Sequence, residues 1–277
     1  MSPQTRREAY ERRQRRRSLL IASASTVIVV AAVIVLVPRA PRWDRVKTSF
    51  FNRDIFVDTF PGLLRAFWLD VQIFLWSLPL IFVLSLAIAI ARNTRSPAFF
   101  PLRAFAVIYT DVFRGVPVIL TIFLIGFGVP GLFDSRTWSN PLIWGTVALV
   151  LSYSAYVSEE IRAGIEGVHE SQRAAARSLG MSSRQTMSTV VLPQALRRIV
   201  PPMMNSIVSL QKDVALISLI GPVEILRQAG IDKAKFANFT PYVGAAVIFL
   251  ALTIPMTRVA DYLLARERKR TGATVVA

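Results

Sequence analysis

The sequence predicts an all-α, polytopic membrane protein built around one membrane domain. Hydrophobic residues make up 53% of its 277 residues, and several uncharged stretches are long enough to cross a hydrocarbon core of about 30 Å. Backbone polar groups in lipid must be satisfied within the segment, which favours helices. No stretch alternates between apolar and polar residues in the two-residue rhythm of a membrane barrel strand.

Six apolar segments carry this prediction, and each is expected to form a membrane-spanning helix. The first, second and fourth contain no charged residue, whereas the other three each contain an acid and a base. In chain order the segments are Leu19–Val37, Val71–Ala91, Ala104–Gly128, Pro141–Val157, Ile199–Ile220 and Tyr242–Leu264.

The segments imply a domain organisation and an orientation. The block RREAYERRQRRR precedes the first segment and, by the positive-inside rule, is expected to stay in the cytoplasm with the C-terminus. The connector before the second segment has six basic residues on the outer side, which runs against this rule. We expect a basic cytoplasmic tail (1–18), a transmembrane helix (19–37), an extracytoplasmic connector (38–70), a membrane domain (71–264) with a cytoplasmic loop (158–192), and a cytoplasmic tail (265–277).

The first segment is interpreted as a retained anchor. It exceeds the usual length of a signal-peptide apolar core, and VPRAPRW offers no small-x-small cleavage site.

The charge of the chain is not interpreted as a nucleic-acid signal. Thirty-three basic against 17 acidic residues give a formal charge of +16, but the basic residues cluster at the ends of apolar stretches, where they meet anionic lipid. Cysteine is absent, which excludes disulfides and thiolate metal sites. The single histidine, His169, is expected to be a surface or capping group, so no metal site is predicted.

A polar, alanine-rich stretch, RAAARSLGMSSRQTMSTVVLP (173–193), separates two apolar segments. Ser171 or an adjacent residue can cap a short helix that runs to Leu179, and Gly180 suits the left-handed position that ends such a helix.

This short helix would present a surface with almost no side-chain bulk. Leu179 and Met181 are predicted apolar anchors for a partner. The residues alone allow two interpretations: a docking surface, or a solvated loop helix without a partner. The candidate docking residues are Arg173, Ala174, Ala175, Ala176, Arg177, Leu179, Gly180 and Met181.

Charges within the apolar segments are a second candidate site, because a charge at mid-bilayer costs about 2.5–3.5 kcal/mol on insertion scales. Asp111 and Arg114 are three residues apart, on one helix face, and can pair with each other. Lys212 and Asp213 are adjacent and point in different directions. Both sets lie in segments that Gly115-Val116-Pro117 or Pro201-Pro202 is expected to interrupt, as in many transporter ligand sites. They form either part of a substrate pathway or structural ion pairs.

The alanine-rich stretch resembles the cytoplasmic loop motif of ABC importer permeases: Glu-Ala-Ala, three residues, Gly, nine residues, Ile, one residue, Leu-Pro. Ala175, Ala176, Gly180, Leu192 and Pro193 match the motif, Val190 stands for the isoleucine, and Ala174 replaces the glutamate.

Three neighbouring stretches are similar to the polar amino-acid branch of this family. They are YTDVFRGVPVILTIFLIGFGVP (109–130), with Val116 in place of a threonine, SAYVSEEIRAGIEGV (154–168), and LPQALRRIVPPMMNSIVSLQKDVALISLIG (192–221). The resemblance covers about residues 60–265. It implies a five-helix type I ABC importer permease core with one extra N-terminal transmembrane helix.

The resemblance further implies an importer subunit in a bacterial inner membrane that passes a polar amino acid. The implied partners are an ABC ATPase dimer that docks on the alanine-rich loop, a second permease that is identical or related, and an extracytoplasmic substrate-binding protein. The chain lacks a G-x-x-x-x-G-K-[ST] phosphate loop. ATP and Mg are therefore expected on the ATPase, and this chain is expected to bind no cofactor and to be no enzyme.

Three alternatives remain open. The solute could be another small amine-bearing molecule such as an opine or cystine, or the protein could be an ion-coupled carrier or channel. The third alternative is a membrane anchor whose loop merely recruits a soluble partner.

Overall fold

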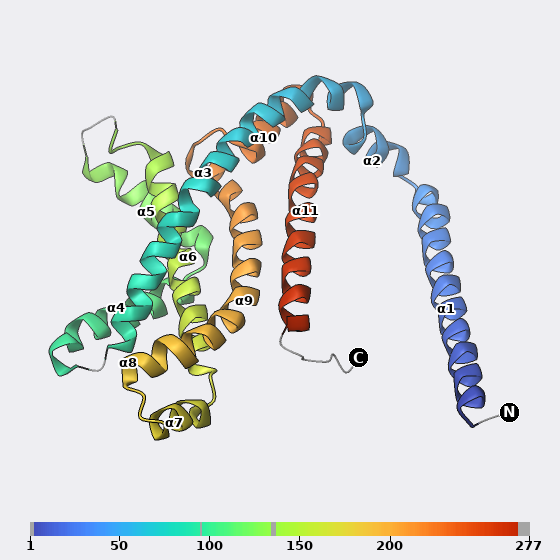
Figure 1. Cartoon of the computed structure of the whole chain (residues 1–277). Helices are drawn as coiled ribbons and strands as arrows, with labels where there is room; N and C mark the ends of the chain where they lie inside the picture. Colours follow the sequence, from blue (N-terminus) through green and yellow to red (C-terminus); the bar gives the residue numbers. More distant parts are fainter. Residues whose placement is uncertain (1–2, 95, 134–136, 271–277) are drawn as a thin grey trace. The chain divides into compact units, whose positions relative to one another are not determined.

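The computed structural model describes residues 3–94, 96–133 and 137–270 (Figure 1). The described residues form helices and contain no strand. Five helical stretches are long and apolar enough to cross a membrane, and a sharply bent helix pair gives a sixth if it counts as one span. The multi-pass helical prediction is therefore confirmed. The chain divides into two units, 1–54 and 55–277, and each is described by itself.

The first unit consists of α1 (Pro3–Leu36), the 3-10 turn η1 (Val37–Arg39) and α2 (Trp43–Phe50). The uncharged stretch predicted at 19–37 lies in α1 except for Val37, its last residue, which begins η1. Its hydroxyl groups are satisfied inside the helix, since Ser23 Oγ donates to the Leu19 carbonyl at 2.8 Å and Thr26 Oγ1 to the Ala22 carbonyl at 2.8 Å. Pro38 has no amide hydrogen to continue the helix, and α1 ends two residues before it.

The second apolar segment is part of a much longer helix, α3 (Arg53–Asn93), which takes in the second half of the predicted connector. Thr59, Leu63 and Asp70 are buried, whereas Arg53, Asp58 and Arg65 are exposed. Most charges of the predicted connector that fall in α3 are thus exposed side chains of a helix, while Asp70 is buried.

The third segment is broken, as its Gly-Val-Pro sequence predicted. The 3-10 turn η2 (Pro97–Phe99) leads into α4 (Phe100–Gly115), and α5 (Val118–Gly128) follows at an angle of 107° before η3 (Pro130–Leu132). Val116 is extended, with φ −94° and ψ 129°, because the residue before a proline is disfavoured in the helical region.

The remaining elements are α6 (Pro141–Glu166), α7 (Glu170–Ser178), α8 (Ser183–Gln185), the π-helical turn η4 (Thr186–Val191), α9 (Leu192–Asp213), the 3-10 helix η5 (Val214–Ile220), α10 (Ile225–Phe236) and α11 (Thr240–Arg270). The Asn140 side chain caps α6 by accepting from the Leu142 amide at 3.0 Å. Helix α6 continues nine residues beyond the predicted Val157, so the polar loop begins at Gly167. The predicted interruption at Pro201-Pro202 is wrong, since both prolines lie inside α9.

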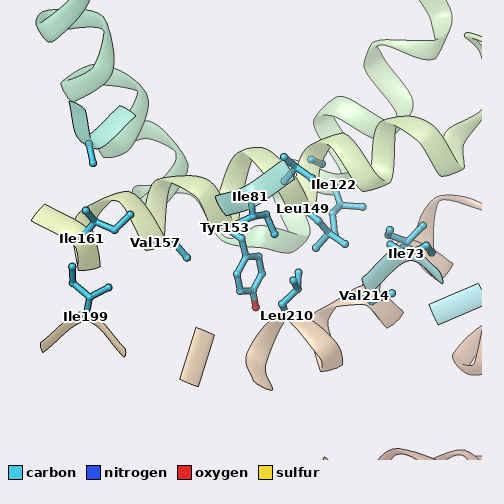
Figure 2. Close-up of a cluster of buried hydrophobic side chains, with 14 of the residues drawn as sticks. Ile73, Ile81, Ile122, Leu149, Tyr153, Val157, Ile161, Ile199, Leu210 and Val214 are labelled. Carbon is cyan, nitrogen blue, oxygen red and sulfur yellow. The ribbon is translucent and has the colours of Figure 1, made fainter. Parts of the chain in front are cut away.

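The core of the second unit is built around α6. Figure 2 shows Tyr153 of α6 between Ile81 of α3 and Leu210 of α9, and Ile161 of α6 facing Ile199 of α9. Figure 1 places α7 at one end of this unit and α10 at the other.

Small residues allow α6 and α9 to approach closely, as in many membrane helix pairs. A Cβ atom on Gly164 would overlap Ile199 Cγ1 and would lie 3.3 Å from the Ala195 carbonyl oxygen. Gly126 of α5 and Gly145 of α6 likewise leave room for the Ile220 side chain.

Gly164→Ala is expected to lower the free energy of unfolding by about 1–3 kcal/mol, because the added methyl group forces Ile199 or the α9 backbone to shift. Gly62→Ala is the matched control, since nothing lies within 4 Å of that position in α3. The control is expected to be neutral or slightly stabilising. Thermal unfolding of the purified proteins measures both, and equal melting temperatures for the two variants would refute the close approach.

Candidate functional site

The alanine-rich stretch forms α7, with both ends capped. His169 Nδ1 accepts from the Ser171 amide at 3.2 Å, so His169 is the N-cap. This confirms its predicted role as a capping group, and it corrects the predicted cap at Ser171. At the other end Gly180 has φ +79°, and its amide donates to the Arg177 carbonyl at 2.9 Å. The Met181 amide donates to the Ala176 carbonyl at 3.1 Å, which completes a Schellman cap.

The outward face of α7 is exposed and carries mostly small side chains. Ala174, Ala175, Arg177 and Gly180 are exposed, and Leu179 is 83% exposed although it is apolar. Such a face lets another protein approach the backbone closely, and Leu179 can bury its side chain against that protein.

Two predicted docking residues serve instead to hold α7 in place. Ala176 is only 4% exposed, because α7 packs on η4 with this side. Arg173 was a candidate docking residue, but its Nη2 donates to the Ile165 carbonyl at 2.6 Å, which links α7 to the end of α6. Met181 is half-buried. The exposed face therefore comprises fewer residues than the sequence suggested.

The predicted pairing of Asp111 with Arg114 is wrong. Asp111 is exposed, and Arg114 Nη1 lies 3.8 Å from Glu159 Oε1 of α6. Glu159 also accepts from Arg92 Nη1 of α3 at 2.7 Å and from Arg162 Nε at 3.0 Å. One carboxylate thus joins three helices, where α3, α4 and α6 meet.

Lys212 and Asp213 do have different surroundings, as expected. Lys212 is exposed, whereas Asp213 Oδ2 accepts from the Tyr153 hydroxyl at 2.8 Å. Asp213 thereby ties the end of α9 to the middle of α6.

Sequence reasoning missed a polar groove between α6 and α9. The groove has a volume of about 390 Å³, and Arg114, Glu159, Glu160 and Arg198 supply its charges. Ser206 Oγ donates to Glu160 Oε1 at 2.5 Å, while Glu160 Oε2 is buried with no hydrogen-bond partner among the described residues. The adjacent Glu159-Glu160 pair in a long helix was the available signal.

An apolar cavity of about 340 Å³ lies between α3, α6 and α9. Leu78 and Phe82 of α3, Tyr153 of α6, and Met203 and Ile207 of α9 are among its lining residues, and Ser206 also lines it. Ser206 therefore lines this cavity and also donates to the Glu160 carboxylate.

In the described part of the chain, no group of three or more histidine, cysteine, aspartate or glutamate side chains could hold a metal ion.

Comparisons with known proteins agree with this architecture. Residues 84–269 match the family described as "Binding-protein-dependent transport system inner membrane component". The chain is 32% identical over 219 residues, 79% of its length and 99% of the relative's, to the probable glutamine ABC transporter permease protein GlnM of Bacillus subtilis (strain 168). It is 31% identical to the arginine transport system permease protein ArtQ of the same organism, over 71% of this chain and 88% of the relative.

Among solved structures, an amino acid ABC transporter crystallised with histidines matches with a TM-score of 0.61 and 30% identity, covering 77% of this chain and 94% of the matched chain. The family match at residues 84–269 includes α6, α7 and α9. The chain therefore belongs to the family of binding-protein-dependent transport system inner membrane components.

Proposed function

We propose that the chain is the permease subunit of an ATP-driven importer that carries a polar amino acid across a bacterial plasma membrane. The observation that carries this proposal is α7, a capped helix with an exposed small-residue face, in a chain that belongs to a transport family. Relatives named for glutamine and arginine transport support the substrate class.

The proposed role of α7 is to bind an ABC ATPase subunit through Ala174, Ala175, Arg177, Leu179 and Gly180. Two contacts pass its motion to the membrane helices: Arg173 to the Ile165 carbonyl at the end of α6, and the packing of α7 on η4, which leads into α9. Because Glu160 lies on α6 and Ser206 on α9, a relative movement of these helices changes the groove between them. ATP and Mg belong to the ATPase in this account.

The proposed substrate pathway runs through the polar groove. The ammonium group of an amino acid meets Glu160, whose free Oε2 has no partner among the described residues. Its carboxylate meets Arg114 or Arg198. Of the four charged residues predicted as pathway candidates, Arg114 lines the groove, Asp111 and Lys212 are exposed, and Asp213 accepts from Tyr153.

The proposed orientation places α7 and both termini in the cytoplasm. In Figure 1 the C-terminal end of α11 lies toward the same end of the second unit as α7, which supports this for the C-terminus. Exposed apolar side chains on α4 and α5, such as Phe105 and Leu124, are then available to a second permease or to lipid. An extracytoplasmic binding protein would deliver the solute at the end where α10 lies.

The test is ATPase stimulation in liposomes that contain this chain with its ATPase and binding protein. Each polar amino acid is offered in turn, together with an opine and cystine. ATP turnover and uptake that rise together with one amino acid are the expected result. Uptake by the purified chain alone, driven by an ion gradient without ATP, would contradict the proposal and favour a carrier.

A further inference from the structure

Two buried carboxyl groups meet where α3 packs against the start of α10. Asp70 of α3 is 2% exposed, and Glu224, which precedes α10, is 0% exposed. Glu224 accepts from the Leu226 amide at 2.9 Å and the Arg227 amide at 2.8 Å, while Asp70 Oδ2 accepts from the Ile225 amide at 3.2 Å. Two acids therefore share the three first amides of one helix, and their carboxyl groups lie within hydrogen-bonding reach of each other.

No cation neutralises this pair among the described residues. Neither acid has an ion pair there, and Arg227 directs its Nη1 to the Ser218 carbonyl at 3.2 Å. Asp70 Oδ1 is buried and has no hydrogen-bond partner among the described residues. The surrounding packing from α3, α10 and α11 is apolar, with Tyr242 as its titratable member. The buried Ser218 hydroxyl of η5 also lies within hydrogen-bonding reach of Glu224.

The Asp70 and Glu224 carboxyl groups cannot both stay ionised while they are buried next to each other. Each carboxylate would lose its hydration, and the two negative charges would repel each other. The start of α10 can stabilise one negative charge through its amides and its dipole. Burial raises the pKa of the Glu224 carboxyl above its ordinary range. No comparable set of amides or helix dipole stabilises a negative charge on the other carboxyl group.

We propose that Asp70 and Glu224 form a proton-binding site, in which one proton is shared between the two carboxyl groups and holds α10 against α3. Asp70 Oδ1 carries the proton and donates it toward the Glu224 carboxylate, which satisfies the oxygen that otherwise lacks a partner. The site does not depend on the proposed transport function. Figure 1 places α10 at the end of the second unit opposite α7. With α7 in the cytoplasm, the site lies on the outer side and responds to the pH outside the cell, and this part of the proposal rests on the proposed orientation.

The sign of the pH dependence follows from proton linkage. The folded protein binds this proton more tightly than the unfolded chain does, so the free energy of unfolding falls as the pH rises above the ordinary range of a carboxyl group. Loss of the proton also restores the repulsion between α3 and the start of α10. Alkaline conditions are therefore expected to loosen α10 first.

The test compares melting temperatures of the purified full-length protein from about pH 6 to about pH 9. The wild type is expected to lose thermal stability steadily as the pH rises. Asp70→Asn is expected to flatten this dependence, because the Asn amide donates to Glu224 without a titrating proton. Asp58→Asn, an exposed acid on the same helix, is the matched control and is expected to follow the wild type.

A second variant and a direct readout cover the case in which Asp70→Asn folds poorly. Glu224→Gln still accepts from the amides of α10 and donates to Asp70, so it is expected to flatten the pH dependence too. Infrared spectra near neutral pH are expected to show a protonated-carboxyl band in the wild type and in Asp58→Asn, and to lose it in both site variants.

Equal pH slopes for all four proteins, or a protonated-carboxyl band that neither site variant removes, would overturn the proposal. A wild-type melting temperature that follows sodium concentration instead of pH would overturn it as well, since the occupant would then be a metal ion. These readouts need no transport, so they fail or succeed separately from the proposed function.

Discussion

Ala175→Glu is expected to lower ATP-driven uptake by about tenfold or more while the protein remains folded. Ala175 is exposed on the small-residue face of α7, and glutamate is a good helix former, so α7 itself should persist. The new side chain would hold the ATPase away from the helix backbone and would bury an unpaired charge at the contact. Reconstituted transport and substrate-stimulated ATPase activity measure the effect, and both should fall together.

Ala174→Glu makes the same chemical change one residue earlier and is the matched control. The loop motif of related permeases has glutamate there, so this variant is expected to transport as well as the wild type or better. If both variants transport at the wild-type rate, α7 is not the site at which the ATPase acts.

Glu160→Gln is expected to lower transport efficiency by about 10- to 100-fold, mainly through weaker substrate binding. Glutamine keeps nearly the same shape and can still accept from Ser206, so the substitution removes little besides the negative charge. Hydrogen bonds to charged groups contribute about 1.5–3 kcal/mol, which sets the range. Uptake measured across substrate concentrations separates this effect from a loss of folded protein.

Glu166→Gln is the control for this prediction, because Glu166 lies on the same helix but is exposed and pairs with Arg162. It is expected to leave uptake unchanged. An unaltered apparent affinity in Glu160→Gln would remove Glu160 from the substrate pathway.

Local features of the molecule could be predicted from sequence where one residue determines the backbone. Gly180 ends α7 in the left-handed conformation, and Pro117 breaks the third segment, both for steric reasons that need no tertiary information. The burial of Ala176 could also have been predicted from the sequence. Successive residues on a helix point about 100° apart, so three consecutive alanines cannot all face one partner.

Features that depend on distant residues could not be predicted in the same way. Arg114 was assigned to Asp111, three residues away, whereas its partner Glu159 belongs to another helix. The carboxyl pair of Asp70 and Glu224 joins positions that lie far apart in the chain, and no local pattern indicates it. The early start of α3 was hidden because its exposed charges resemble those of a loop until the buried face opposite them is known.

The central claim is that an ATPase binds α7 on the cytoplasmic side, and a single cysteine tests it most directly. The chain contains no cysteine, so Ala175→Cys introduces a unique thiol on the exposed face of α7. In intact cells this thiol should resist membrane-impermeant reagents and should crosslink to the ATPase subunit. Labelling from outside the cell, or the absence of any crosslink to a nucleotide-hydrolysing protein in an actively transporting complex, would contradict the account.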